Sequence, residues 1–373
     1  MSVVVTGYGL CTGVRSDLAG VLGGTLEPPA EVSAGAGLPV RRVDDAETAP
    51  WVPRRLARKM DRISRITTAA VGQAIQHARL DEPDLVRGTG LVLSTAFGSA
   101  GVVSRVLADV LSDDPVISPL LFPNVVANAA AGQASIAFGL RGPNSVLGGV
   151  GGLMYAFDML ASGRAERLLV GGFDEMTDVY ERALAATGFS VPVRAIGEGA
   201  AVVVLETDDA ARGRGAEPLA ELVAASVASD LEFTLDGASA YAGDGMARSL
   251  AAVAAQAPVP ELFLGSGWPD TLLRDSEERY VRRAIVDAAQ WPKDATGEMF
   301  ACSAALNAVL AAAAISGGPD AGRPAPRSVV VTAHDSSRGQ SEAAYFRAPA
   351  AAGAVGGGEN AGNRAVQPSG RVA

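Results

Sequence analysis

The chain has 373 residues, 48% of them hydrophobic and 19% charged, and its net charge at pH 7 is −10. This length allows two domains or one large duplicated unit with an extensive core. The acidic balance, without a basic run interleaved with aromatic residues, argues against nucleic acid as a partner. No apolar run reaches the roughly 18 residues of a membrane span, and Cys11 and Cys302 are too few for a disulfide framework or a metal cluster.

The N-terminal segment MSVVVTGYGL has the pattern of a strand and lacks the basic start and cleavage site of a signal peptide, so we expect a cytoplasmic protein. Ser2–Thr6 is predicted as a strand that leads into a turn at Gly7–Gly13. Residues 22–58 contain five prolines and are predicted as loop and short edge pieces. Asp61–Arg79 is predicted as a helix because apolar residues share one of its faces: Ile63, Ile66, Ala70 and Ala74.

The next elements alternate between strands and helices. We expect a strand at Gly90–Ser94, a small-residue turn at Gly98–Gly101 and a helix at Val102–Leu111. After a break at Pro119–Pro123, the remaining predictions for this half are a helix at Ala127–Phe138, strands at Ser145–Leu147 and Arg167–Val170, a helix at Tyr180–Thr187, and strands around Val191 and at Ala200–Glu206.

The second half of the sequence repeats this order. Its predicted elements are a strand at Glu261–Gly265, a helix at Glu277–Gln290, an alanine-rich helix at Cys302–Ile315 and a strand at Ser328–Thr332. Alternation is common in α/β proteins, but the matching order and spacing favour a duplicated unit. We therefore predict an N-terminal half over 1–207, a C-terminal half over 208–347 and a flexible tail over 348–373.

A glycine-rich turn, the elbow (Gly148–Gly152), joins the strand at Ser145–Leu147 to an apolar helix. Such a turn usually presents a nucleophile at the N-terminus of the helix that follows. Here Gly149, Val150 and Gly151 offer neither a thiol nor a hydroxyl group. The elbow is therefore predicted to carry no catalytic residue.

Several segments together resemble the β-ketoacyl synthases of the thiolase superfamily. They are VVVTGYGLCTGV, ARKMDRISRITTAAVGQAIQHARLD, PLLFPNVVANAAAGQASIAFGLRGPNSV and IGEGAAVVVLE. The resemblance implies an α/β thiolase fold with five layers, αβαβα, two pseudo-equivalent halves and an obligate dimer. The enzymes of that family hold an acyl chain on an elbow cysteine, and two histidines assist the decarboxylation of a malonyl unit. No cofactor is implied beyond the phosphopantetheine that tethers the chain to its carrier protein.

The chain departs from that family where its catalytic residues are expected. No cysteine lies between Gly142 and Leu153, and the block that should read Thr-Gly-His reads Thr296-Gly297-Glu298. The segment that follows Ser316, GGPDAGRPAPRSVVV, contains no histidine, and the family's late glycine-rich loop is replaced by Asp335–Gln340. Loss of a nucleophile of this kind costs about 10⁶ in rate, so condensation by this chain alone is not expected.

One branch of the family has this property. Chain-length factors, the inactive partners in type II polyketide synthases, keep the fold and lose the cysteine. The chain retains their Gly-Gly-Leu at Gly151–Leu153 but not their glutamine, and LLFPNVVANAAAGQASI is similar to factors of highly reducing, polyene-type systems. The resemblance implies an obligate heterodimer with an active ketosynthase, which extends chains on an acyl carrier protein from malonyl units while this subunit bounds their length. The basic docking patch for the carrier is expected on the partner.

In chain-length factors the helix after the small-residue turn lines the dimer interface and the channel for the growing chain. This implies channel roles for Val102, Val103, Val106 and Val110, of which the last three share one helical face. Leu121 and Phe122 are expected to complete the wall. Ordinary core packing of these side chains is the alternative.

Two other functions stay open from the sequence. A divergent thiolase-like acyltransferase could use Cys302 and His334 as nucleophile and base, although a cysteine on an alanine-rich helix is more often a small core residue. A homodimeric acyl-binding protein is the second. Glu298, in the place of a histidine, would need a partner if buried, and Arg338 is the basic residue that we expect to pair with it.

Overall fold

The computed structural model describes residues 2–14, 17–27, 31–34, 37–115, 118–187, 195–230, 243–269, 271–317, 324–335 and 338–350. The predicted strand around Val191 and all but the first three residues of the predicted tail lie outside the described residues. Within the described part of the chain, no helix combines the length and the apolar character needed to cross a membrane.

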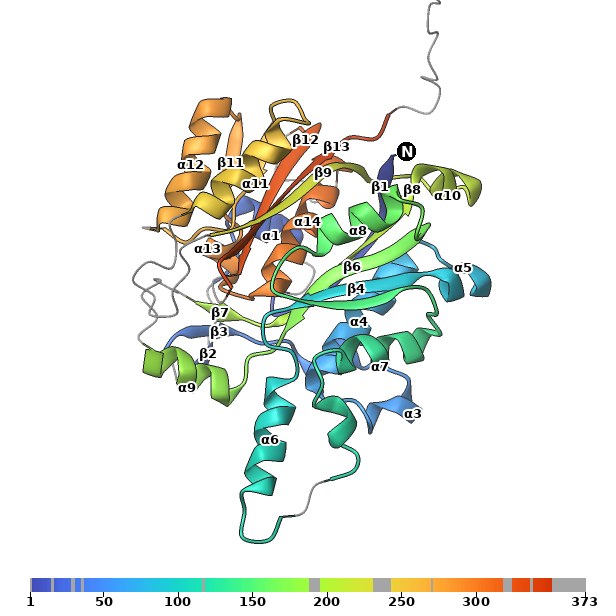
Figure 1. The fold of residues 1–373 in the computed structure, drawn as a ribbon, viewed down its shortest axis with the longest axis vertical. Coiled ribbons are helices and arrows are strands. Elements are labelled where there is room, and N and C mark those ends of the chain that lie inside the picture. Colours follow the sequence, from blue (N-terminus) through green and yellow to red (C-terminus); the bar gives the residue numbers. More distant parts are fainter. Residues whose placement is uncertain are drawn as a thin grey trace, which may run out of the picture.

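Ten strands form one mixed sheet whose order is mirrored about its centre. The order is β11-β10-β12-β13-β9-β1-β8-β6-β4-β5 (Figure 1). Counted from either edge of the sheet, the first three strands are parallel, and the fourth and fifth each run antiparallel to their neighbours. The two halves join where β1 pairs with β9. The first half holds β1 (Val3–Thr12), β4 (Gly90–Thr95), β5 (Asn144–Gly148), β6 (Arg167–Asp174) and β8 (Gly199–Thr207). The second holds β9 (Ala220–Ser229), β10 (Leu262–Leu264), β11 (Ala288–Gln290), β12 (Ser328–Asp335) and β13 (Gln340–Arg347).

Helices cover both outer faces of the sheet and fill the space between its halves. On the outside, α4 (Arg62–His77) and α7 (Ala129–Phe138) pack on the first half, and α11 (Asp244–Ala254) and α12 (Leu272–Ala284) on the second. Between the halves lie α8 (Gly152–Ala161), which contacts β6 and β9, and α14 (Ala301–Ile315), which contacts β6, β8 and β12 (Figure 1). This arrangement confirms the predicted five-layered fold with two pseudo-equivalent halves; the boundaries at residues 207 and 347 remain predictions.

The alanine-rich composition of α14 follows from its central position. Every residue of this helix except Ala304 is buried, and its side chains contribute to the largest apolar cluster of the molecule. A helix that is apolar on all sides belongs inside a protein. Small side chains let strands approach α14 from both half-sheets, which a helix of leucines would prevent.

Two sequence predictions of secondary structure are wrong. The turn predicted at Gly7–Gly13 is the continuation of β1, and Gly9 is required there for packing: a Cβ on it would lie 2.1 Å from the carbonyl oxygen of Ala70 in α4. The helix predicted at Glu277–Gln290 ends at Ala284, where Ile285 adopts a left-handed conformation, and the chain then forms the edge strand β11.

Sequence patterns also did not predict β9, α11 and β13, or several short elements. These are α1 (Leu18–Gly23), β2 (Glu31–Val32), β3 (Pro39–Arg41), α2 (Asp45–Thr48), α3 (Arg54–Ala57), α5 (Pro83–Gly88), β7 (Ile196–Gly197), α10 (Asp208–Gly213) and α13 (Lys293–Thr296). The other elements are α6 (Ala100–Val110), a 3₁₀ turn at Phe122–Asn124 and α9 (Asp178–Thr187).

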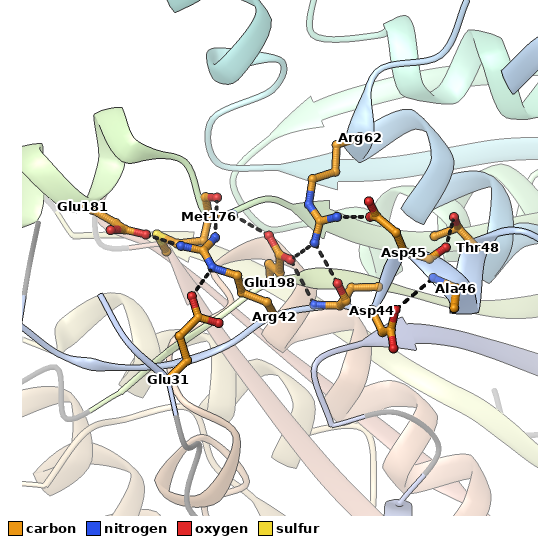
Figure 2. Close-up of polar contacts among 11 residues, drawn as sticks. Glu31, Arg42, Asp44, Asp45, Ala46, Thr48, Arg62, Met176, Glu181 and Glu198 are labelled. Atoms are coloured by element: carbon orange, nitrogen blue, oxygen red, sulfur yellow. Dashed lines mark hydrogen bonds and ion pairs between the residues drawn. The ribbon is translucent and has the colours of Figure 1, made fainter. Parts of the chain in front are cut away.

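A buried ionic network ties the start of β8 to the N-terminal segment (Figure 2). Glu198 is fully buried and accepts hydrogen bonds from the amides of Val43, at 2.9 Å, and Met176, at 3.1 Å, and from the guanidinium of Arg62. Arg62 also pairs with Asp45. A buried carboxylate with this many donors avoids the cost of an unpaired charge. Because Met176 follows the end of β6 by two residues, the network also fixes the position of that strand end.

The Gly171-Gly172 pair in β6 marks the closest approach between the layers. A Cβ on Gly171 would lie 2.1 Å from the carbonyl oxygen of Ala201 in β8, and one on Gly172 would lie 2.1 Å from that of Ala301 in α14. In both cases the obstructing atom belongs to the backbone, so it cannot rotate away. These glycines allow β6 to pass between β8 and the first turn of α14.

We expect Gly172→Ala to lower the free energy of unfolding by roughly 1–3 kcal/mol or more, because the added methyl group overpacks a fixed backbone contact. Gly132→Ala is the matched control: Gly132 lies within α7 with nothing within 4 Å of the added Cβ, and alanine there should stabilise the protein by roughly 0.5–1 kcal/mol. Urea denaturation followed by circular dichroism measures both. Equal effects of the two substitutions would contradict the close packing at β6.

Candidate functional site

The elbow has backbone geometry that favours glycine at two positions. Gly149 has φ +90° and Gly151 has φ +110°, whereas Val150 between them is buried and is not among the residues with positive φ. A Cβ on Gly149 would also lie 2.4 Å from Oδ2 of Asp335 and 2.9 Å from Oε1 of Gln340. The β12–β13 hairpin therefore occupies the space into which a side chain at Gly149 would project.

The N-terminus of α8, where an elbow usually presents its nucleophile, is bound by Glu342 of β13. The amide of Gly151 donates to Oε2 of Glu342 at 3.1 Å, and the amide of Met154 donates to Oε1 at 2.9 Å. Glu342 is buried, and desolvation raises its pKa to about 7 in spite of these donors. No pattern in the sequence pointed to this residue.

The N-terminus of α14 is bound in the same way by Asp174, at the end of β6. Asp174 accepts hydrogen bonds from the amide of Ala301 at 3.0 Å, from Oγ1 of Thr95 at 2.7 Å and from the amide of Ala96 at 3.1 Å. It is buried, and desolvation raises its pKa to about 7. Both interior helices thus begin at a buried carboxyl group.

Glu298, predicted in the place of a histidine, is buried and paired with a lysine. Nζ of Lys293 lies 2.7 Å from Oε2 of Glu298, and Nε1 of Trp268 donates to the same oxygen at 3.2 Å. The amide of Phe300 donates to Oε1 at 2.8 Å. The expectation of a basic partner is confirmed, but Arg338 is not that partner: it pairs with Asp335 at 2.8 Å.

Cys302 and His334 are both buried, in environments that disfavour their charged forms. Cys302 lies on the first turn of α14, and desolvation raises the pKa of its thiol well above the usual range. Burial and the charge of Lys293 lower the pKa of His334 to about 3, and Nδ1 of its ring lies 2.9 Å from Oγ of Ser341. Thiolate formation at Cys302 therefore receives no help from its surroundings.

Two small cavities border the elbow. One, of about 20 Å³, is lined mainly by apolar groups of β6, α8 and α14, together with Val150 and Glu342. The other, of about 10 Å³, brings Val150 together with Glu298, His334 and Asp335. Each volume accommodates at most one water molecule. The structure therefore gathers the predicted residues Val150 and Glu298 at one point, in a space too small for an acyl chain.

The predicted channel residues lie on a part of the molecule that projects from the sheet (Figure 1). On α6, Val102 is buried, Val103 and Val106 are partly exposed, and the exposed fraction of Val110 is 43%. The 3₁₀ turn that follows carries Phe122, which is 60% exposed, next to the partly buried Leu121. Further exposed apolar side chains on α6 and around this turn are Leu107, Leu111, Leu120 and Val126.

Comparison with known proteins shows what the chain is similar to. Residues 30–211 match the model of the β-ketoacyl synthase N-terminal domain. The chain is 26% identical over 365 residues to 3-oxoacyl-[acyl-carrier-protein] synthase 2 of Synechocystis sp., covering 84% of this chain and 85% of that protein. It is 28% identical over 214 residues to the enzyme of the same name from Vibrio harveyi, covering 50% and 51%.

Solved structures share the fold at lower identity. The ishigamide ketosynthase/chain length factor superposes with a TM-score of 0.79 at 19% identity, over 94% of this chain and 99% of that one. A type II polyketide synthase ketosynthase bound to the hexaketide, in complex with its acyl-carrier protein, gives a TM-score of 0.74 at 20% identity, over 93% and 99%. The chain is thus similar to β-ketoacyl synthases over residues 30–211, and it shares the thiolase-like fold of the solved ketosynthases.

Proposed function

We propose that the chain is a non-catalytic chain-length-factor subunit. It pairs with an active ketosynthase, and the complex extends polyketide chains on an acyl carrier protein from malonyl units. The elbow carries this proposal: Gly149, Val150 and Gly151 supply no nucleophile, and side chains of the β12–β13 hairpin fill the space in front of Gly149. Condensation needs a thiol or an equivalent group at this place.

The competing function is catalysis by this chain, as in the synthases to which it is similar. It would have to use Cys302 and His334. The high pKa of the buried thiol and the low pKa of the imidazole oppose it, because the pair would exist as thiol and neutral ring. His334 is also held by Ser341.

Two features support a protein partner on one side of the molecule. The apolar side chains of α6 and of the 3₁₀ turn lie in solvent, with Leu111 83% exposed, and a contiguous exposed apolar surface marks an interaction site. Among the described strands, β5 pairs with β4 alone and ends the sheet. An edge strand of this kind can pair with a strand of another subunit, and an obligate interface would bury about 2,000 Å² or more.

A basic segment in this acidic chain supports carrier-protein docking close to the same side. Arg54, Arg55, Arg58 and Lys59 are exposed, and Nδ2 of Asn124, in the 3₁₀ turn, donates to the carbonyl of Lys59 at 2.9 Å. Carrier proteins of this family are acidic, so charge complementarity favours their approach here. This segment would add to the docking patch expected on the partner, which stays a prediction.

Co-expression with the ketosynthase encoded beside it tests the proposal. We expect the chain alone to be poorly soluble or inactive, and the complex to extend malonyl units on the carrier protein. In the complex, Cys302→Ala should leave the rate unchanged, whereas replacing the partner's elbow cysteine should abolish it. Turnover of acyl and malonyl thioesters by the purified chain, lost in Cys302→Ala, would overturn the proposal. A soluble symmetrical homodimer without turnover would instead favour the acyl-binding function.

We expect Val106→Phe to shift the products of the complex toward shorter chains. Val106 lies on the face of α6 shared with Val103 and Val110, and a phenyl ring there would narrow a channel at the interface. Ala108→Phe adds the same ring about 200° away around the helix and should leave product length unchanged. Mass spectrometry of the products decides between them, and identical product lengths from both variants would contradict the channel role.

The proposal also makes Glu298 a structural residue. Lys293→Met should lower the free energy of unfolding by about 3–5 kcal/mol, because it leaves a buried carboxylate without its cation. Adding Glu298→Gln should recover most of this loss, since the amide keeps an acceptor for Phe300 without the charge. Thermal and urea unfolding measure the recovery. Glu298→Gln by itself should leave condensation by the complex intact, and its loss would point to a catalytic role for Glu298.

A further inference from the structure

The N-terminus of each interior helix is bound by a carboxyl side chain from the other half of the molecule. Glu342 comes from β13 in the second half and binds the start of α8 in the first half. Asp174 comes from β6 in the first half and binds the start of α14 in the second half. The corresponding helices of the two halves are thus each bound by a carboxyl group from the opposite half-sheet. The two ligands come from strands that are not equivalent in the sheet order, because β6 corresponds to β12 and β13 corresponds to β8.

At α8, this ligand fills the position where an elbow would act on a substrate. The first N–H groups of a helix have no partner within the helix and attract anions or reacting oxygens. Here both oxygens of Glu342 are engaged, one by Gly151 and the other by Met154. The side chain also lines the apolar cavity between α8 and α14, beside Val150.

We propose that Glu342 is an internal ligand that closes the elbow: its carboxyl group takes the amides at the start of α8 and excludes any other group from them. This deepens the proposed non-catalytic function, on which it rests. A thiol restored at the elbow would then not be sufficient for catalysis, because the carboxyl group of Glu342 would still occupy the amides at the start of α8. Opening the elbow requires removal of Glu342.

Val150 offers a position for a reporter thiol. It is the non-glycine residue within Gly148–Gly152 and is not among the residues with positive φ, so Val150→Cys introduces neither backbone strain nor extra volume. Its side chain borders the cavity that Glu342 lines. The native cysteines provide a silent background, because Cys11 and Cys302 are buried and desolvation raises the pKa of both, that of Cys11 to about 12.

The test measures how fast iodoacetamide labels the thiol introduced by Val150→Cys in the native full chain, with its partner present where the chain requires it. Peptide mass spectrometry locates the label. In Val150→Cys alone we expect slow labelling. Adding Glu342→Ala should accelerate it at least tenfold and speed hydrogen exchange of the amides of residues 151–154 by a similar factor. Exchange at residues 301–305, in the first turn of α14 where Asp174 binds the amide of Ala301, should not change and reports that the fold is intact.

Glu221→Ala in the same Val150→Cys background is the matched control, since Glu221 is a buried glutamate on the adjacent strand β9 that pairs with Arg347 instead of the elbow. It should leave both rates unchanged. Equal labelling and equal exchange with and without Glu342 would overturn the inference, as would acceleration by both alanine substitutions. Because the readout is a thiol on this chain, that failure would leave the co-expression result, and hence the proposed function, unaffected.

Discussion

The structure depends on satisfying two helix N-termini in a place that water does not reach. α8 and α14 both begin between the half-sheets, where unpaired N–H groups would each cost several kcal/mol. Glu342 and Asp174 remove that cost, although each carries a desolvation cost of its own, which raises its pKa to about 7. These two residues connect the start of each central helix to the opposite half of the sheet.

Under the proposed non-catalytic function, the same constraint explains how a fold suited to acyl transfer can lose its chemistry and keep its shape. An elbow with a reactive residue leaves helix amides available to the reacting group. In this chain a carboxyl group accepts hydrogen bonds from those amides, and a lysine-paired glutamate, Glu298, stands where the family resemblance implies a histidine. Both replacements are buried and hydrogen-bonded through both carboxyl oxygens, so they stabilise the interior that a vacant active site would leave open.

Local sequence patterns predicted most of the long helices and strands, because apolar periodicity and burial go together. These patterns failed where tertiary contacts, and not the local secondary structure, determine the residue type. Gly7 and Gly9 suggest a turn by composition, yet both lie in β1. They are glycine because α4 and the residue that follows it pack too closely against the strand for a side chain. β13 begins with Gln340, Ser341 and Glu342, which lack the apolar pattern of a strand. Polar residues are accommodated there because Ser341 and Glu342 form hydrogen bonds inside the protein.

The amino-acid sequence by itself determined that the elbow has no thiol, that Glu298 stands in a Thr-Gly-Glu block and that the chain resembles ketosynthases, since these are properties of residue identity and spacing. Only the tertiary structure decided which groups surround the elbow. Lys293 rather than Arg338 pairs with Glu298, and Glu342 reaches Gly151 across 191 positions of sequence. Partners this distant are chosen by the packing of two half-sheets around α8 and α14, which no local pattern records.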